Sequence, residues 1–185
     1  VGNVAIVFQR DVLLDWRTVL GNVLLPVEIK KLDPVVHRQK ARDLLRSVGL
    51  EEFEEKYPGE LSGGMRQRVA ICRALVYEPK VLLLDEPLSN LDAKLREEAR
   101  FWIRKLILEL GTCAIMVTHD QGEALAMADH ILLLKDGVIM QQGTPIDIYS
   151  NPHTFYSAEF LGTNNVSKAK VASINGEGLM VQGDG

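Results

Sequence analysis

Four short apolar runs limit the possible folds of this chain more than any other feature of its sequence. They cover residues 4–8, 81–84, 114–117 and 131–134, and polar residues do not alternate with apolar ones inside them. Strands that helices cover on both faces of a parallel sheet have continuous apolar sequences of this kind. Segments with helical patterns separate the runs. The sequence therefore predicts an α/β fold with a mainly parallel sheet.

Several local signals mark where these elements begin and end. Asp33 and Pro34 are typical of a helix start and predict a helix over 34–48, while a second, amphipathic helix over 92–110 ends at Gly111. The pair Asp136-Gly137 after the fourth apolar run predicts a hairpin. The returning strand should be antiparallel, which would make the sheet mixed at one edge.

The run VLLLDEP at 81–87 carries the first chemical signal. Asp85 and Glu86 come at the carboxyl end of a predicted strand, and Pro87 cannot continue a central strand. Ligands of α/β sheets bind at this edge, so Asp85 suits a Mg²⁺ ligand and Glu86 suits a base for an attacking water. A solvated turn after a core strand explains the same two carboxylates, and the strand alone leaves both interpretations open.

The segment LSGGMRQR at 61–68 carries the second chemical signal. Ser62, Gly63 and Gly64 open a predicted helix, and the two glycines leave backbone N–H groups uncovered by side chains. A helix N-terminus of this kind can approach a phosphate closely. Ser62 also serves as an ordinary N-cap, so this segment alone has a purely structural explanation.

Charge and hydropathy narrow the classes of partner. The chain has 185 residues and a formal net charge of −4, with no long basic run, so nucleic acid is not an expected partner. No apolar run approaches the roughly 20 residues of a membrane-spanning helix. If the protein works at a membrane, we expect another chain to cross it.

Taken together and in order, five motifs resemble those of the ATP-binding cassette family. LSGGMRQR is similar to its signature motif, VLLLDEP to its Walker B strand, the segment at 89–92 to its D-loop, VTHD at 117–120 to its switch histidine, and VAIVFQ at 4–9 to its Q-loop. The resemblance covers residues 1–162. It implies a partial P-loop NTPase fold with a helical subdomain at about 12–78.

The resemblance also implies roles for individual residues toward ATP and Mg²⁺. Glu86 would polarise the attacking water, His119 would contact the γ-phosphate, and Gln9 would approach the metal together with Asp85. In a head-to-tail dimer, the ATP of one subunit would be closed by Ser62, Gly63 and Gly64 of the other. Gln67 and Asp92 would also belong to the nucleotide-binding residues, and Asp92 would help link the two ATP sites across the dimer. Phosphoryl transfer to water would then proceed by positioning and electrostatics, without a covalent enzyme intermediate.

One departure from the family pattern concerns phosphate binding. No GxxxxGK[ST] occurs in the sequence, although this loop supplies the phosphate-binding Lys and the Mg²⁺ hydroxyl. We therefore expect the chain to be a fragment that begins after this loop and does not hydrolyse ATP by itself. Asn90 stands in the D-loop where a small residue is more usual, which is a minor deviation.

Two regions favour an importer within this family. The segment after Gln9 resembles the region where importer ATPases receive a helix of the permease, with an apolar groove formed by Leu13, Leu14, Trp16 and Val19. Packing inside the chain's own helical subdomain is the competing explanation for about half of these side chains. Residues 141–165 resemble the junction to an OB-like regulatory domain in importers of sugars, polyamines, iron and inorganic anions, so 163–185 would open that domain. The stretch at 15–20 instead resembles importers of nitrate and sulfonates, which leaves the solute open.

These resemblances imply a set of partners and a location. We expect a second ATPase subunit, transmembrane permease subunits and a solute-binding protein, with this chain peripheral on the cytoplasmic face of the membrane. The alternatives are a regulatory cassette that binds ATP without turnover and a nucleic-acid-associated cassette. The presence of Glu86 and His119 argues against the first, and the lack of a coiled-coil insertion or basic face argues against the second.

Overall fold

The computed structural model describes residues 3–161, 169–175 and 178–183. Contacts within the chain divide it into two units, Val1–Asp120 and Gln121–Gly185. Every residue predicted to act on ATP lies in the first unit. The two units are described separately below.

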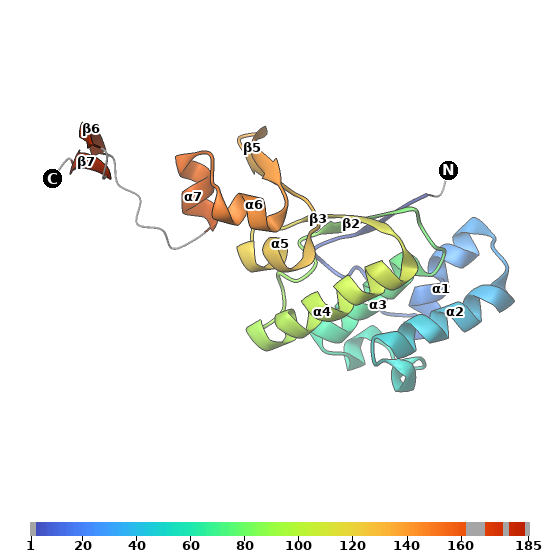
Figure 1. Cartoon of the computed structure of the whole chain (residues 1–185). Coiled ribbons are helices and arrows are strands. Elements are labelled where there is room, and N and C mark those ends of the chain that lie inside the picture. Colours follow the sequence, from blue (N-terminus) through green and yellow to red (C-terminus); the bar gives the residue numbers. More distant parts are fainter. Residues whose placement is uncertain (1–2, 162–168, 176–177, 184–185) are drawn as a thin grey trace. The chain divides into compact units, whose positions relative to one another are not determined.

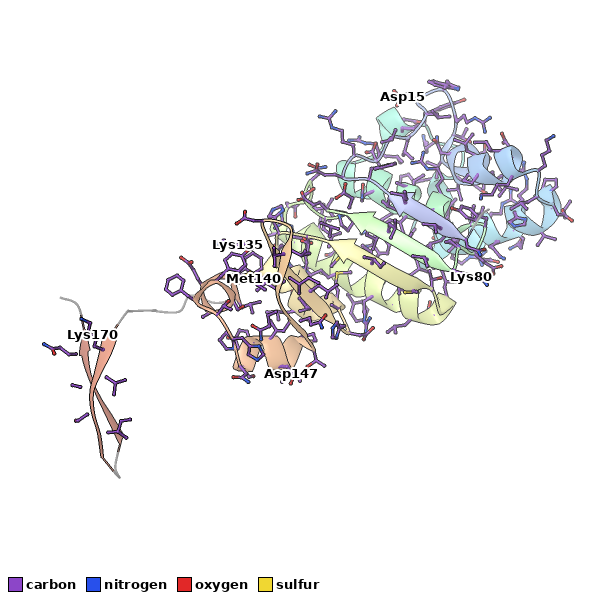
Figure 2. The ribbon with its side chains drawn as sticks, turned by 90° about the horizontal axis from the view of Figure 1, so that it is seen from above. Asp15, Lys80, Lys135, Met140, Asp147 and Lys170 are labelled. Atoms are coloured by element: carbon purple, nitrogen blue, oxygen red, sulfur yellow. The ribbon has the colours of Figure 1, made fainter. Side chains whose placement is uncertain are left out.

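A three-stranded parallel sheet organises the first unit. Strands β1 (Val4–Val7), β2 (Val81–Asp85) and β3 (Cys113–Val117) lie in the order β1-β2-β3, with Leu82 of β2 opposite Ala5 on one side and Ala114 on the other. Figure 2 shows the three strands side by side. The apolar runs thus predicted these strands and their parallel direction, and their carboxyl ends share one edge.

The two faces of this sheet differ in burial. Ala5, Leu82 and Leu84 are at most 3 % exposed, while Ile6 is 50 % and Ile115 54 % exposed. Helices α3 (Gly63–Leu75) and α4 (Ala93–Leu110) lie on one face of the sheet in Figures 1 and 2. The prediction that helices cover both faces is therefore wrong for the described residues, because all helices of this unit lie along or beside a single face.

Four α-helices belong to the described part of the first unit. They are α1 (Val19–Lys30), α2 (Pro34–Ser47), α3 (Gly63–Leu75) and α4 (Ala93–Leu110), with short 3-10 turns at Glu51–Phe53 and Pro58–Glu60. Asp33 caps α2 as predicted, since its carboxylate accepts the N–H groups of Val35 and Val36. Helices α1 to α3 fall within the predicted helical subdomain at 12–78, whose boundaries stay a prediction.

The end of α4 provides a test of local backbone stability. Gly111 ends this helix in the left-handed conformation, with φ of 62°. A side chain costs about 1–2 kcal/mol in that conformation, so Gly111→Ala should lower the free energy of unfolding by about 1 kcal/mol. Gly59→Ala is the matched control, because Gly59 does not adopt the left-handed conformation and an added Cβ there would have no neighbour within 4 Å. Urea unfolding of both variants measures the difference, and equal stabilities would contradict it.

The second unit begins with helix α5 (Gln121–Met127) and a hairpin. Strands β4 (Ile131–Lys135) and β5 (Val138–Gly143) pair antiparallel, and the turn residues Asp136 and Gly137 have φ of 51° and 78°, which confirms the predicted hairpin. Helices α6 (Pro145–Ser150) and α7 (Phe155–Leu161) follow. Ile131, Ile148 and Leu161 form the core of this unit.

The hairpin corrects the prediction of a sheet that is mixed at one edge. Within the described residues β4 pairs only with β5, in a separate two-stranded sheet, and does not join β3. The short turn at Asp136-Gly137 makes pairing with the next strand local, whereas pairing with β3 would need a further contact that the apolar pattern cannot specify.

The last described residues form a second hairpin, of β6 (Ala169–Asn175) and β7 (Gly178–Gly183). This agrees with β-structure after residue 165, while an OB-like domain stays a prediction. The predicted linker and domain boundary near residue 162 lie outside the described residues. Among the helices described, none is both long and apolar enough to span a membrane.

Candidate active site

The peptide of Glu86 turns the chain sharply at the end of β2. Glu86 has φ of 43°, an unfavourable conformation for a residue with a side chain. Its N–H donates to the carbonyl oxygen of Val117 at 2.9 Å, which ties this turn to the end of β3. The preceding Asp85 is exposed, and the following Pro87 is buried. The Glu86 carboxylate is thus directed by a fixed backbone at the carboxyl edge of the sheet.

Three predicted site residues meet at this edge. The Gln9 side chain donates from Nε2 to Oε2 of Glu86 at 2.9 Å, and Nδ1 of His119 lies 3.1 Å from Oε1 of the same carboxylate. Each residue follows a different strand, β1, β2 or β3. We call Gln9, Glu86 and His119 the Glu86 cluster. Both carboxylate oxygens have a partner, so the cluster holds the carboxylate in one orientation.

Exposure within the Glu86 cluster suits a site that acts on a bound ligand. The side chain of Glu86 is 29 % exposed and that of His119 is 73 % exposed. Water can therefore reach the carboxylate. Because Nδ1 of His119 faces Glu86, Nε2 is the ring nitrogen available to a ligand.

Hydrogen bonds connect the loop between β2 and α4 to the main chain of the Glu86 cluster. The Ser89 hydroxyl donates to the carbonyl oxygen of Glu86 at 3.0 Å, and Nδ2 of Asn90 donates to the carbonyl oxygen of Gln9 at 2.9 Å. Asp92, predicted to link two ATP sites, is the N-cap of α4 and accepts the N–H of Leu95 at 2.9 Å. Asp92 is exposed, so this cap does not prevent a contact with a second chain.

The predicted phosphate-binding segment forms the N-terminus of α3. Ser62 is its N-cap, and its hydroxyl accepts the N–H of Met65 at 3.3 Å. A Cβ on Gly63 would meet nothing nearer than Nη2 of Arg66 at 3.9 Å, so the backbone there is open. Among the described hydrogen bonds, none joins Ser62, Gly63 or Gly64 to the Glu86 cluster. Their assignment to the ATP of another subunit stays a prediction.

Gln67, the remaining predicted nucleotide contact, lies inside the protein. It is 6 % exposed, and its Nε2 has no hydrogen-bond partner among the described residues. Gln67 lines a pocket of about 210 Å³ between α3 and α4, together with Ser62, Gly64, Met65, Arg68, Leu91, Leu95, Ala99 and Trp102. Its role as a nucleotide contact stays a prediction.

Two arginines of α3, which sequence reasoning did not single out, hold the chain after Gln9. Nε of Arg66 lies 2.8 Å from Oδ2 of Asp11, and Arg73 donates to the carbonyl oxygens of Val12 and Asp11 at 2.8 and 2.9 Å. Burial lowers the pKa of Arg73, and the charge of Asp11 opposes that shift. These contacts connect helix α3 to the segment that follows Gln9.

A second missed group surrounds the residue after His119. The carboxylate of Asp120 lies 3.4 Å from Nη1 of Arg96 and 3.2 Å from Nη2 of Arg100, both on α4. All three side chains are 24–30 % exposed, so solvent screens the pairs only in part. The two arginines thereby hold the segment after β3 that carries His119. Their spacing of four residues on one helix was the signal available in the sequence.

The donor set at this edge fits Mg²⁺ in part. Mg²⁺ takes oxygen ligands and is often held by one or two carboxylates together with substrate phosphates. Asp85 offers an exposed carboxylate, and Gln9 retains its amide oxygen because its Nε2 donates to Glu86. The described residues contain no group of three or more His, Cys, Asp or Glu side chains placed to hold a metal. This chain could thus supply ligands to a metal that also binds a nucleotide.

The sequence of this chain is similar to those of known proteins. A family model described as ABC transporter matches residues 1–89. The chain is 46% identical over 180 residues to the Fe(3+) ions import ATP-binding protein FbpC of Rhizobium etli, which covers 97% of this chain and 51% of that protein. It is 43% identical over 182 residues to the spermidine/putrescine import ATP-binding protein PotA of Thermotoga maritima, covering 98% and 50%. The chain spans about half the length of the curated relatives it matches.

Proposed function

Because the chain belongs to the ABC transporter family, we propose that it carries the hydrolytic residues of an ATP-driven importer subunit. The observation that carries this proposal is the engagement of the Glu86 carboxylate by Gln9 and His119 at the carboxyl edge of the sheet. The relatives are named as import ATP-binding proteins, which supports a function in transport. They lend no support to a regulatory or nucleic-acid-associated cassette.

In the proposed reaction, Glu86 accepts a proton from the water that attacks the γ-phosphate. Gln9 keeps Oε2 of the carboxylate in place, and the Nε2 edge of His119 faces the phosphate, where its contact strengthens as charge rearranges. When bound, Mg²⁺ would neutralise phosphate charge, and Asp85 with the amide oxygen of Gln9 would be its ligands from this chain. Hydrolysis then rests on positioning and electrostatics.

The proposal includes a second ATPase subunit. Ser62, Gly63 and Gly64 form a helix N-terminus that is open at Gly63 and makes no described hydrogen bond to the Glu86 cluster of the same chain. A helix N-terminus with uncovered N–H groups stabilises phosphate oxygens. In a head-to-tail dimer this segment would close the ATP held at the partner's cluster, and the exposed Asp92 would lie near the dimer interface.

A transmembrane permease is the second proposed partner, with this chain on the cytoplasmic face of the membrane. Trp16 is 75% exposed and follows Asp11, whose main chain is held by Arg73. Val19, in contrast, is fully buried in α1. Val19 therefore packs within its own subdomain, which corrects its assignment to the groove. Trp16, with the half-buried Leu13 and Leu14, remains the apolar surface proposed for the permease helix. A solute-binding protein outside the membrane would complete the importer.

Solute uptake in the host tests the transport function. The relatives are named for Fe(3+) and for spermidine and putrescine, so deletion of the gene should lower uptake of one of these labelled solutes at least about tenfold. The natural gene should restore uptake, and a gene with Glu86→Gln should not, because ATP hydrolysis drives the transport cycle. Unchanged uptake of all three solutes would leave these solute classes without support. Equal rescue by both genes would contradict the coupling itself.

A further inference from the structure

The loop that carries Glu86 is held at both ends. At its start, the N–H of Glu86 donates to Val117, and at its end Nη2 of Arg96 donates to the carbonyl oxygen of Leu91 at 2.9 Å. Between these points the side chain of Leu88 is fully buried. The main chain at Asn90 therefore has a fixed position relative to the sheet, and its side chain can serve as a rigid support.

Gln9 has much less support from its own surroundings. It lies two residues beyond the end of β1, it is exposed, and the preceding Phe8 is 54 % exposed. The contacts of Arg73 hold the main chain two and three residues later, at Asp11 and Val12. At Gln9 itself, the main chain is held by the 2.9 Å hydrogen bond from Nδ2 of Asn90, a residue 81 positions away in sequence.

These contacts form a closed ring through the Glu86 cluster. The ring runs from the Glu86 carboxylate to the Gln9 side chain, through the Gln9 main chain to the Asn90 side chain, and back along the loop to Glu86. We propose that Asn90 is a positioning residue for ATP hydrolysis, which holds the Gln9 main chain so that the Gln9 amide keeps the Glu86 carboxylate oriented. The inference rests on the proposed function of Glu86 and assigns Asn90 no contact with ATP.

The isosteric substitution Asn90→Asp tests this role in the full-length natural protein. It keeps the shape of the side chain but replaces the donor by a negative oxygen that faces the Gln9 carbonyl oxygen. We expect kcat for Mg-ATP hydrolysis to fall about five- to tenfold, in line with the loss of one hydrogen bond, while KM stays within about twofold. Asn3→Asp is the control, since Asn3 is exposed at the other end of β1 and the substitution adds the same charge.

A double-mutant cycle with Gln9→Ala separates positioning through Gln9 from an independent effect. If Asn90 acts through Gln9, the double variant should be no slower than Gln9→Ala alone, because the path from Asn90 to Glu86 is already broken. Effects on kcat that multiply, or a raised KM with unchanged kcat, would overturn the inference. Parent-like kcat in Asn90→Asp would overturn it as well.

A spectroscopic readout keeps the test independent of ATP turnover. With ¹⁵N-labelled glutamine side chains, the NH₂ signal of Gln9 can be identified by its loss in Gln9→Ala. In Asn90→Asp this signal should move toward its position in Glu86→Ala, where Nε2 of Gln9 has lost its acceptor. An unmoved signal would contradict the inference. If the signal moves but the parent protein does not hydrolyse ATP, the proposed function fails while the positioning contact stands.

Discussion

Glu86→Gln is expected to slow ATP hydrolysis by at least about a hundredfold in the full-length natural protein, the lower range for loss of a general base. The amide has the shape of the carboxylate and can still contact Gln9 and His119, but it cannot accept the proton of the attacking water. Because the substitution keeps the groups that we propose to contact phosphate, the affinity for Mg-ATP should change by less than about threefold. Phosphate release and equilibrium binding of ATP measure the two quantities.

A control carboxylate is available on α4. Glu98 is exposed and forms no described hydrogen bond or ion pair, so Glu98→Gln removes the same charge away from the cluster and should leave turnover within about twofold. Near-parent turnover of Glu86→Gln would remove Glu86 from the role of base. A large loss in both variants would point to a general effect of charge instead.

His119→Ala should lower kcat about a hundredfold with a smaller change in KM, the second largest effect that we expect. His119 lies 3.1 Å from Glu86 and is 73 % exposed, so its removal costs little packing. The contact that we propose between His119 and the phosphate would matter most in the transition state, which is why turnover should suffer more than affinity. His130→Ala is the control, since His130 is exposed and lies outside the cluster. A rise in KM alone would make His119 a binding residue.

Local signals in the sequence predicted much of this fold. The continuous apolar runs indicated β1, β2 and β3, because such runs are typical of buried parallel strands. Gly111 and the pair Asp136-Gly137 marked a helix end and a hairpin, since each needs a backbone conformation that favours glycine or aspartate. These signals act over a few residues, which is why they can be read without the structure.

The features that could not be predicted depend on contacts between residues far apart in the sequence. The exposure of Ile6 and Ile115 depends on which face of the sheet the helices cover, and the separate pairing of β4 depends on its partner strand. The same holds for the contact from Asn90 to Gln9 and for the burial of Gln67. Motif order indicated that Gln9, Glu86 and His119 share a site, but only the structure gives the hydrogen bonds between them.

The identity of the nucleotide that stays bound after incubation tests the role of the Glu86 cluster most directly. The full-length natural protein and its Glu86→Gln and Glu98→Gln variants would be incubated with Mg-ATP, separated from free nucleotide, quenched with acid and analysed by chromatography. If Glu86 acts in the chemical step, the natural protein and Glu98→Gln should retain ADP, while Glu86→Gln should retain ATP. Retention of ADP by Glu86→Gln, in the same amount as by the natural protein, would contradict the account.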